Sequence, residues 1–278
     1  GVFNLVNGDG AGVGSVLSAH PDVEMISFTG STRAGRAISK AAAETLKRVT
    51  LELGGKGANV IFADADDRAV ERGVRHMMNN TGQSCNAPSR MLVQRPIYDQ
   101  AVETAARIAD SIKVGSAHDA GGHIGPVVNK RQWDQIQGYI QKGIDEGAKL
   151  LVGGVGVPEG CTTGYYVKPT VFSNVKNSMT IAQEEIFGPV LSIIAYEDED
   201  DAVQIANDTV YGLSGGVWAS TKEKGIAIAR RIRTGQIAVN GGAFNINAPL
   251  GGYKQSGVGR EYSEYGFDEF LEIKSMQL

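Results

Sequence analysis

The sequence predicts an α/β fold built around a largely parallel sheet. The main observation is that short apolar runs alternate with amphipathic stretches almost throughout the chain, a pattern typical of β-α-β units. A second observation is the glycine content, because 37 of the 278 residues are glycine, roughly twice the average usage of about 7%. Glycine at this level is typical of a chain with many tight turns or with backbone that approaches a ligand closely.

The composition is that of a globular chain of one or two domains. A hydrophobic fraction of 42% and a charged fraction of 21% supply ample material for a core and exclude a disordered or collagen-like chain. The 27 Lys and Arg residues stand against 31 Asp and Glu and form no basic block, so no nucleic-acid partner is expected. The longest apolar runs, such as residues 190–195, are far shorter than a membrane span, so no membrane partner is expected either.

The cysteine content and the first residues of the chain indicate the cellular compartment. Only Cys85 and Cys161 are present, which excludes a disulfide framework and a CxxC metal site and favours a reducing, cytoplasmic compartment. The chain opens with Gly1 and a strand-like run, without an initiator Met, a basic region or the apolar core of a signal peptide. This start is typical of a cut end rather than of a leader.

Strands are expected at the apolar runs, which are bounded by polar or glycine-containing turns. They are residues 2–6, 23–28, 48–53, 58–62, 89–93, 149–153, 189–196, 215–220, 236–241 and 270–276. Helices are expected where apolar residues recur at helical spacing, as Val70, Val74 and Met77 do. These stretches are residues 32–47, 66–80, 97–112, 129–146, 199–208 and 221–233. Asp64 is the expected cap of the helix at 66–80, and glycine-rich residues 153–164 and 241–259 are expected to form long surface loops.

Cys85 lies in the polar segment 81–88, between an expected helix and an expected strand. A cysteine is most often a small buried hydrophobe, and that is one interpretation. The polar, glycine-containing context favours another, a partly exposed thiol that ionises and acts as a nucleophile. Cys161 lies in a glycine loop without a candidate base nearby, and we expect no role for it.

Glu52 ends an apolar strand and precedes the pair Gly54 and Gly55. On strand alternation it shares a face with Thr50, and one interpretation is a solvent-facing strand glutamate. The other is a general base, because open α/β sheets present catalytic groups at the carboxyl ends of their strands.

Glycines at strand-to-helix turns are candidates for phosphate binding. Residues 28–32 end a strand and begin a helix, where backbone N–H groups suit a phosphate. The alternative is that Ser31 or Thr32 serves only as the helix cap. The glycines of residues 8–14 lack the spacing of the dinucleotide-binding fingerprint, and residues 54–57 lack that of a P-loop.

The remaining polar groups predict less. Glu184 and Glu185 form an acidic pair before Phe187, and such a pair is most often a solvated face. The four histidines show no metal-ligand spacing, and no nucleophile elbow surrounds a serine. We therefore expect neither a metal site nor serine hydrolase chemistry.

Six segments, taken together and in order, resemble the aldehyde dehydrogenase superfamily. They are FTGST (28–32), LELGGK (51–56), GQSC (82–85), EEIFGPV (184–190), PLGGYKQSG (249–257) and GRE (259–261). The resemblance covers essentially the whole chain. It implies the NAD(P)-dependent oxidation of an aldehyde to a carboxylic acid. It also implies a truncated Rossmann-like cofactor domain followed by the α/β catalytic domain of that fold.

The resemblance supplies roles for individual residues. It implies that Cys85 is the nucleophile, forming a thiohemiacetal and then a thioester, and that Glu52 is the general base that activates the hydrolytic water. It also implies which residues lie against NAD or NADP. These are Gly30 and Ser31 at the pyrophosphate, with Gly10 and Gly35 as neighbours, and Glu185 and Phe187 at the nicotinamide ribose and ring.

The chain departs from the family pattern in two places. Leu250 stands where a PFGG motif has an aromatic residue at the aldehyde tunnel, and Phe244 in the preceding loop is the candidate replacement. Family members also carry a part that precedes the position of Gly1. By resemblance that part holds the first half of the Rossmann domain and the Asn that shares the oxyanion with the cysteine N–H.

We therefore expect residues 1–54 to be a remnant of the NAD(P)-binding domain and residues 55–258 to be the catalytic domain. Residues 259–278 are expected to be a C-terminal segment whose strand pairs across the interface of a homodimer or homotetramer. The chain alone is expected to have little or no dehydrogenase activity.

Three alternatives stay open. One is a CoA-acylating aldehyde dehydrogenase, which Glu52 disfavours because that branch commonly lacks this glutamate. Another is a thiol esterase that uses Cys85 and Glu52 without a cofactor. The third is a catalytically silent fragment or assembly module.

Overall fold

The computed structural model describes residues 1–116 and 118–278, and the chain divides into two compact units. One unit joins Gly1–Gly54 to Asn245–Leu278, and the other is Gly55–Phe244. One boundary between the units follows Gly54. The other precedes Asn245, because the segment after it returns to pair with a strand of the first unit.

The first unit contains a three-stranded sheet in the order β1-β2-β10. Strands β1 (Met25–Thr29) and β2 (Arg48–Glu52) are parallel, and β10 (Gly257–Val258) pairs antiparallel with β2. Helix α2 (Thr32–Ala43) connects β1 to β2, as parallel neighbours require. The remaining elements are a π-helical turn at Gly10–Gly14, α1 (Ser15–Ala19), a 3₁₀ turn at Lys254–Ser256 and α9 (Ser263–Asp268).

The second unit is built on a seven-stranded sheet in the order β5-β6-β7-β4-β3-β8-β9. All neighbours are parallel except β5 and β6, which are antiparallel. The strands are β3 (Ala58–Ile61), β4 (Arg90–Gln94), β5 (Lys149–Val152), β6 (Thr170–Ser173), β7 (Val190–Tyr196), β8 (Gly215–Trp218) and β9 (Ala238–Val239). The helices are α3 (Ala69–Met78), α4 (Tyr98–Asp110), α5 (Lys130–Asp145), α6 (Thr180–Gln183), α7 (Glu199–Asn207) and α8 (Lys222–Ala229). Short 3₁₀ turns lie at Asn79–Gly82 and Arg95–Ile97.

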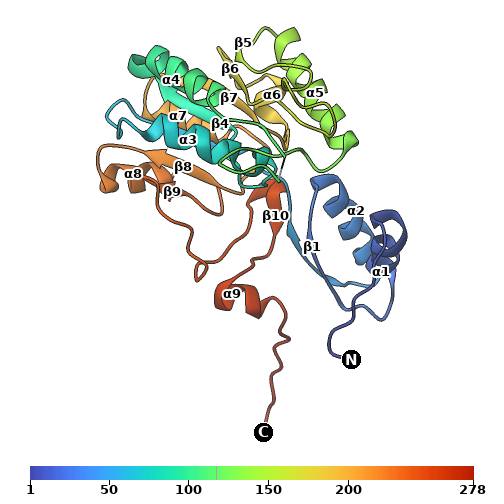
Figure 1. The fold of residues 1–278 in the computed structure, drawn as a ribbon. Coiled ribbons are helices and arrows are strands. Elements are labelled where there is room, and N and C mark those ends of the chain that lie inside the picture. The colour runs from blue at the N-terminus through green and yellow to red at the C-terminus, as the bar shows by residue number, and fades with distance from the viewer. Residues whose placement is uncertain (117) are drawn as a thin grey trace. The chain divides into compact units, whose positions relative to one another are not determined.

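Helices cover both faces of this sheet, so alternate strand residues enter two separate cores. Ile61 of β3 packs into the core beneath α3 and α4, which lie side by side over one face (Figure 1). Its neighbours Val60 and Phe62 pack into the core formed with α5, α7 and α8 on the other face. An α/β fold with a mainly parallel sheet was predicted, and it is confirmed. None of the helices in the described part of the chain combines the length and apolar character needed to cross a lipid bilayer.

The expected strands at residues 2–6 and 270–276 find no strand partner within this single chain. Both segments, all of them described, lack strand structure. Their apolar side chains are exposed, with Phe3 at 84% and Ile273 at 99% of full exposure. An apolar run becomes a strand only where another strand offers its backbone, and the ladders of the first unit end at β1 and β10.

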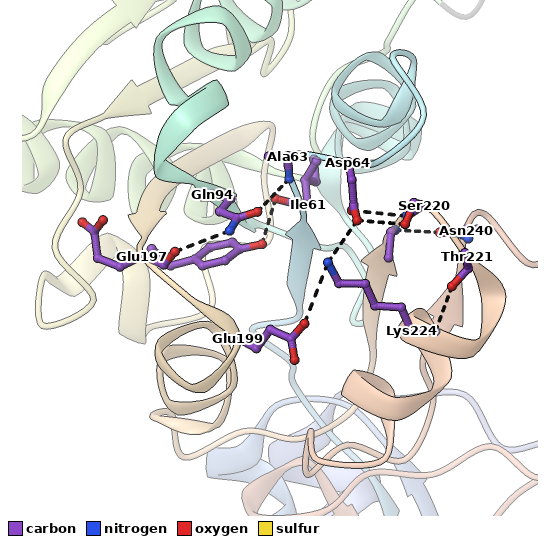
Figure 2. Close-up of polar contacts among 12 residues, drawn as sticks. Ile61, Ala63, Asp64, Gln94, Glu197, Glu199, Ser220, Thr221, Lys224 and Asn240 are labelled. Carbon is purple, nitrogen blue, oxygen red and sulfur yellow. Dashed lines mark hydrogen bonds and ion pairs between the residues drawn. The ribbon is translucent and has the colours of Figure 1, made fainter.

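Asp64 does not cap α3, contrary to expectation. The helix begins at Ala69, and the carboxylate of Asp66 accepts a hydrogen bond from the Arg68 N–H just before it. Figure 2 shows Asp64 turned instead toward the end of β8, where its carboxylate accepts hydrogen bonds from the Ser220 hydroxyl at 2.8 Å and the Lys224 Nζ at 3.1 Å. Asp64 therefore bonds to Ser220 and Lys224, which are distant in sequence, instead of capping the neighbouring helix α3.

Candidate active site

Cys85 lies half-buried in the loop between α3 and β4. The loop is reached through three successive residues with left-handed backbone, Asn80 at φ 51°, Thr81 at φ 58° and Gly82 at φ 68°. The Thr81 hydroxyl donates to the Gly125 carbonyl at 3.0 Å, which helps to hold this conformation. Left-handed backbone at non-glycine residues is costly and tends to occur at functional sites, which favours the reactive interpretation of Cys85 over that of a packing cysteine.

Three of the recognised segments meet around this loop within the second unit. A Cβ on Gly55 would lie 2.3 Å from the carbonyl oxygen of Cys85, and a Cβ on Gly82 would lie 2.2 Å from that of Gly188. The Gly55 N–H also donates to the Glu185 Oε1 at 3.0 Å. LELGGK, GQSC and EEIFGPV are therefore in backbone contact, and glycine is required because any side chain would separate them.

The segment that carries Glu185 and Phe187 is fixed from two sides. The Gln132 side chain of α5 donates to the carbonyls of Ile186 and Phe187, each at 3.0 Å. Burial raises the pKa of Glu185, while the Gly55 N–H and the charge of Lys56 oppose that rise. Glu184 is the exposed member of the pair and accepts a hydrogen bond from the Tyr139 hydroxyl. The expectation of a solvated acidic pair thus holds for Glu184 and is wrong for Glu185.

Glu52 belongs to the first unit and is buried, with 6% of full exposure. The interpretation as a solvent-facing strand glutamate is therefore wrong. Burial, followed by the nearby charge of Glu261, raises its pKa to about 7, against the opposing effects of Arg260 and the Gly252 N–H. Its Oε1 has no hydrogen-bond partner among the residues that the structure describes. A carboxyl with this pKa exchanges protons near neutrality, as a general base must.

The predicted phosphate-binding turn lies at the start of α2 in the first unit. Ser31 is the cap, and its hydroxyl oxygen accepts a hydrogen bond from the Ala34 N–H. Gly30 and Ser31 are exposed, and the first turn of α2, all of it described, carries no acidic residue. The first N–H groups of a helix point along its axis without intrahelical partners, so this terminus suits an anion.

The structure gives the two neighbouring glycines different surroundings. Gly35 is buried on the inner face of α2, where a Cβ would lie 2.7 Å from the Leu53 side chain. That contact supplies a packing reason for glycine. Gly10 is exposed in the π-helical turn and has open space around it.

The two candidate substrate residues are placed in different units. Phe244 ends the second unit and is 61% exposed. Leu250 lies in the first unit, where its backbone pairs with Glu261 through hydrogen bonds at 2.8 Å and 2.7 Å. Cys161 is half-buried in the glycine loop and forms no disulfide within the described part of the chain. Among residues 1–116 and 118–278, no cluster of three or more His, Cys, Asp or Glu side chains has the arrangement of a metal site.

Sequence reasoning missed Lys56 and Arg90. Lys56 is 1% exposed, and its carbonyl accepts a hydrogen bond from the Arg90 Nε at 3.1 Å. The Arg90 guanidinium, also 1% exposed, donates further to Asn177 and to the carbonyls of Ile205 and Ala206. The sequence signal for Lys56 is its place directly after the pair Gly54 and Gly55, within the segment LELGGK.

Comparisons with known proteins agree with this arrangement. The family model described as "Aldehyde dehydrogenase family" matches residues 1–276. A Pseudomonas protein named 3-succinoylsemialdehyde-pyridine dehydrogenase is 55% identical over 277 residues, which are 99% of this chain and 58% of that protein. The crystal structure of an aldehyde dehydrogenase from Bartonella henselae superposes with a TM-score of 0.96 at 59% identity, covering 98% of this chain and 57% of that one.

A second solved structure is aldehyde dehydrogenase C from Pseudomonas syringae, a mutant in complex with NAD⁺ and octanal. It superposes with a TM-score of 0.96 at 51% identity, over 98% of this chain and 56% of that one. The chain thus spans somewhat more than half the length of the relatives it matches. The order of the recognised segments, the fold and the family match together show that this chain belongs to the aldehyde dehydrogenase family.

Proposed function

We propose that this chain supplies the catalytic cysteine and the general base for the NAD(P)-dependent oxidation of an aldehyde to a carboxylic acid. The observation that carries the proposal is the meeting of three segments in the second unit, with Gly55 against the Cys85 carbonyl and its N–H on Glu185. This arrangement links the cysteine loop to the loop proposed to hold the nicotinamide ribose. In a simple structural turn there would be no reason for such contacts.

Cys85 is the proposed nucleophile. Its thiolate attacks the aldehyde carbon, and the carbonyl oxygen becomes an oxyanion that backbone N–H donors stabilise. Loss of the aldehyde hydrogen with its electron pair leaves a thioester on Cys85. Water then attacks the thioester carbon, and the carboxylic acid and the thiol are released.

Glu52 is the proposed general base for the second half of the reaction. Its carboxylate takes a proton from the water that attacks the thioester. A pKa of about 7 suits this role, because the group is substantially ionised at neutral pH and still accepts a proton readily. An Oε1 without a partner among the described residues supports the role as well, because that oxygen is available to a water molecule.

The residues present fit a dinucleotide. The exposed, acid-free start of α2 with Gly30 and Ser31 suits the pyrophosphate, and the Glu185 carboxylate suits ribose hydroxyls. Phe187, held by Gln132, would lie against the nicotinamide ring. When bound, NAD or NADP accepts the hydride that leaves the substrate.

The complete activity is proposed for a protein of the relatives' length. One relative is named as a 3-succinoylsemialdehyde-pyridine dehydrogenase and another was solved with octanal bound, and on this support we propose an aldehyde as the substrate. Residues 1–54 are proposed as part of the cofactor domain. The exposed apolar side chains of the last segment, among them Phe270 and Ile273, support a homodimer or homotetramer.

In the test, this chain replaces the matching region of aldehyde dehydrogenase C from Pseudomonas syringae, with its cysteine intact, to give a chimaera. NADH formation by this chimaera from octanal and NAD⁺ is then followed. The chimaera is expected to turn over, Cys85→Ala to abolish turnover, and Cys161→Ala to leave it unchanged. The 278-residue chain alone is expected to form little or no NADH. Turnover that survives Cys85→Ala contradicts the proposal, and turnover that requires CoA favours the acylating alternative. Absence of NAD⁺ binding by the chimaera favours a silent module.

A further inference from the structure

One small cavity of the second unit is lined by three cationic residues and, among the residues that the structure describes, by no acidic one. It has a volume of about 10 Å³, and Lys56, Arg90 and Arg233 all line it. Lys56 and Arg90 are each 1% exposed, so their charges are withdrawn from water. Two buried cations beside one cavity are costly unless a negative charge compensates them.

Two residues that line this cavity also carry buried polar atoms without a hydrogen-bond partner. These atoms are Lys56 Nζ and Thr234 Oγ1, and neither bonds to any residue that the structure describes. An ammonium can only donate hydrogen bonds, and a hydroxyl can donate one. Because buried polar groups in folded proteins are nearly always hydrogen-bonded, the two donors call for an acceptor from outside the chain.

The other charged groups at the cavity are engaged within the protein. Arg90 donates to three backbone carbonyls and to the Asn177 side chain, so it contributes its positive charge to the cavity. Asp208, the carboxylate whose charge acts on Arg90, accepts a hydrogen bond from the Asn177 Nδ2 at 2.8 Å. The positive charge of the lining is therefore not balanced by an acid in contact with it.

The cavity is joined to the Cys85 loop through Ser214. This residue lines the cavity, and its hydroxyl donates to the Asn86 carbonyl at 3.0 Å. A Cβ on Gly57, which also lines the cavity, would lie 2.9 Å from the Ser214 carbonyl oxygen. A ligand here would therefore stabilise the segments that hold the Cys85 loop.

We propose that this cavity binds one monatomic anion, such as chloride, through the Lys56 ammonium and the Thr234 hydroxyl. The charge of the lining selects an anion over water, because Lys56, Arg90 and Arg233 are all cationic. The size selects a monatomic anion over sulfate, phosphate or a carboxylate, because the volume is about that needed by one water molecule. The site lies outside the residues proposed to act on the aldehyde and does not depend on the proposed function.

The anion and the proton on Lys56 support each other. Without a bound anion, burial and then the charge of Arg90 lower the pKa of Lys56 to about 7, against the opposing charges of Glu185 and Glu184. A neighbouring negative charge favours the ammonium and raises this pKa. Chloride is therefore expected to bind more tightly below pH 7 than above it, and equal affinity on both sides would exclude the Lys56 ammonium as a ligand.

The first test compares chloride with gluconate, which is too large for the cavity, at constant sodium concentration. Urea unfolding of the 278-residue chain is followed through Trp133 and Trp218, which lie in the second unit. Chloride is expected to raise the free energy of unfolding with the saturation of a single site. Lys56→Met is expected to lose this effect, whereas Lys222→Met, which removes an exposed charge from the same unit, is expected to keep it. No effect of chloride on the unsubstituted chain, or an equal effect on Lys56→Met, overturns the proposal.

The second test concerns the hydroxyl donor. Thr234→Val removes one hydrogen bond to a charged ligand, so the half-saturating chloride concentration is expected to rise about tenfold or more. Thr104→Val on α4, away from the cavity, is expected to leave that concentration unchanged. An unchanged concentration in Thr234→Val overturns the two-donor site.

A crystal structure of the unsubstituted chain in sodium chloride locates the anion directly and covers the case in which Lys56→Met does not fold. Anomalous scattering at long wavelength distinguishes chloride from water. One chloride is expected within hydrogen-bond distance of Lys56 Nζ and Thr234 Oγ1. A water molecule at that position, without an anomalous peak, overturns the proposal.

Discussion

Gly55 packs so closely on Cys85 that a Cβ at position 55 would lie 2.3 Å from the Cys85 carbonyl oxygen. The same glycine donates its N–H to the Glu185 Oε1. One residue without a side chain therefore sets the separation between the proposed nucleophile loop and the proposed ribose carboxylate. This relationship explains why the segment LELGGK needs glycine at this point, beyond any requirement of a turn.

Gly55→Ala is the direct test of that contact. The added methyl group meets backbone that cannot rotate away, so we expect the free energy of unfolding of the second unit to fall by about 1–3 kcal/mol. Trp133 and Trp218 both lie in this unit, and their fluorescence during urea denaturation reports its unfolding. The matched control is Gly138→Ala on α5, where nothing lies within 4 Å of a Cβ, and a gain of about 0.5–1 kcal/mol is expected. Equal changes in the free energy of unfolding for Gly55→Ala and Gly138→Ala would contradict the close contact between Gly55 and Cys85.

Arg90→Met tests the buried guanidinium. Its removal leaves the carbonyls of Lys56, Ile205 and Ala206 without their donor, and each buried unsatisfied group costs about 1–3 kcal/mol. We expect a loss of about 3 kcal/mol or more, measured by the same tryptophan fluorescence. Arg95→Met is the comparison, because the Arg95–Glu197 pair is more than half exposed on both sides and is worth under about 1 kcal/mol. If Arg90→Met lowers the free energy of unfolding no more than Arg95→Met does, the buried guanidinium does not have the stabilising role described here.

The lowered pKa of Lys56 makes the stability of the second unit depend on pH. In the folded chain its pKa is about 7, below the ordinary value of 10.5, so the unfolded chain binds more protons between these two values. Stability from this residue therefore rises as the pH goes from about 7 to 10.5. Chemical denaturation of wild type and Lys56→Met across this range is the measurement, and the variant is expected to show a flatter profile. Parallel profiles argue against a depressed pKa at Lys56.

Glu52 is expected to titrate near pH 7 in the folded chain, where burial and Glu261 raise its pKa from the ordinary 4.5. The ¹³C carboxyl shift of Glu52, assigned through Glu52→Gln, measures this directly. Glu71, whose pKa is lowered by its hydrogen bond with Arg75, is an internal reference expected to titrate below 4.5. If Glu52 titrates with the exposed glutamates, it is not the buried base described above.

Periodicity in the sequence was enough to predict most elements of the second unit, because its strands are continuous apolar runs and its helices carry one apolar stripe. It was insufficient where tertiary partners decide the outcome. Residues 2–6 are as apolar as β3 but have no neighbouring strand, and Asp64 bonds to Ser220 rather than to the nearest helix. The α6 and β10 elements are too short for periodicity to reveal them.

The candidate site could also be predicted only in part, because its burial and charge depend on tertiary neighbours. Cys85, Glu52 and Glu185 could be found through segments that resemble a family, but their burial and charge could not. The pKa of Glu52 reflects neighbours about 200 residues away in sequence, Gly252 and Glu261, which no local pattern contains. Lys56 went unrecognised because its surroundings come from Arg90, Thr234 and Glu185.

The most direct test of the central claim is to trap the intermediate on Cys85. In the chimaera carrying Glu52→Gln, hydrolysis of the thioester is expected to be slow, so octanal and NAD⁺ should leave one octanoyl group on the protein after an acid quench. Peptide mass spectrometry is expected to place that group on Cys85, with Cys161 unmodified and no adduct in Cys85→Ala. An octanoyl group on another residue, or turnover with Cys85 never acylated, would contradict the role of Cys85 as the nucleophile.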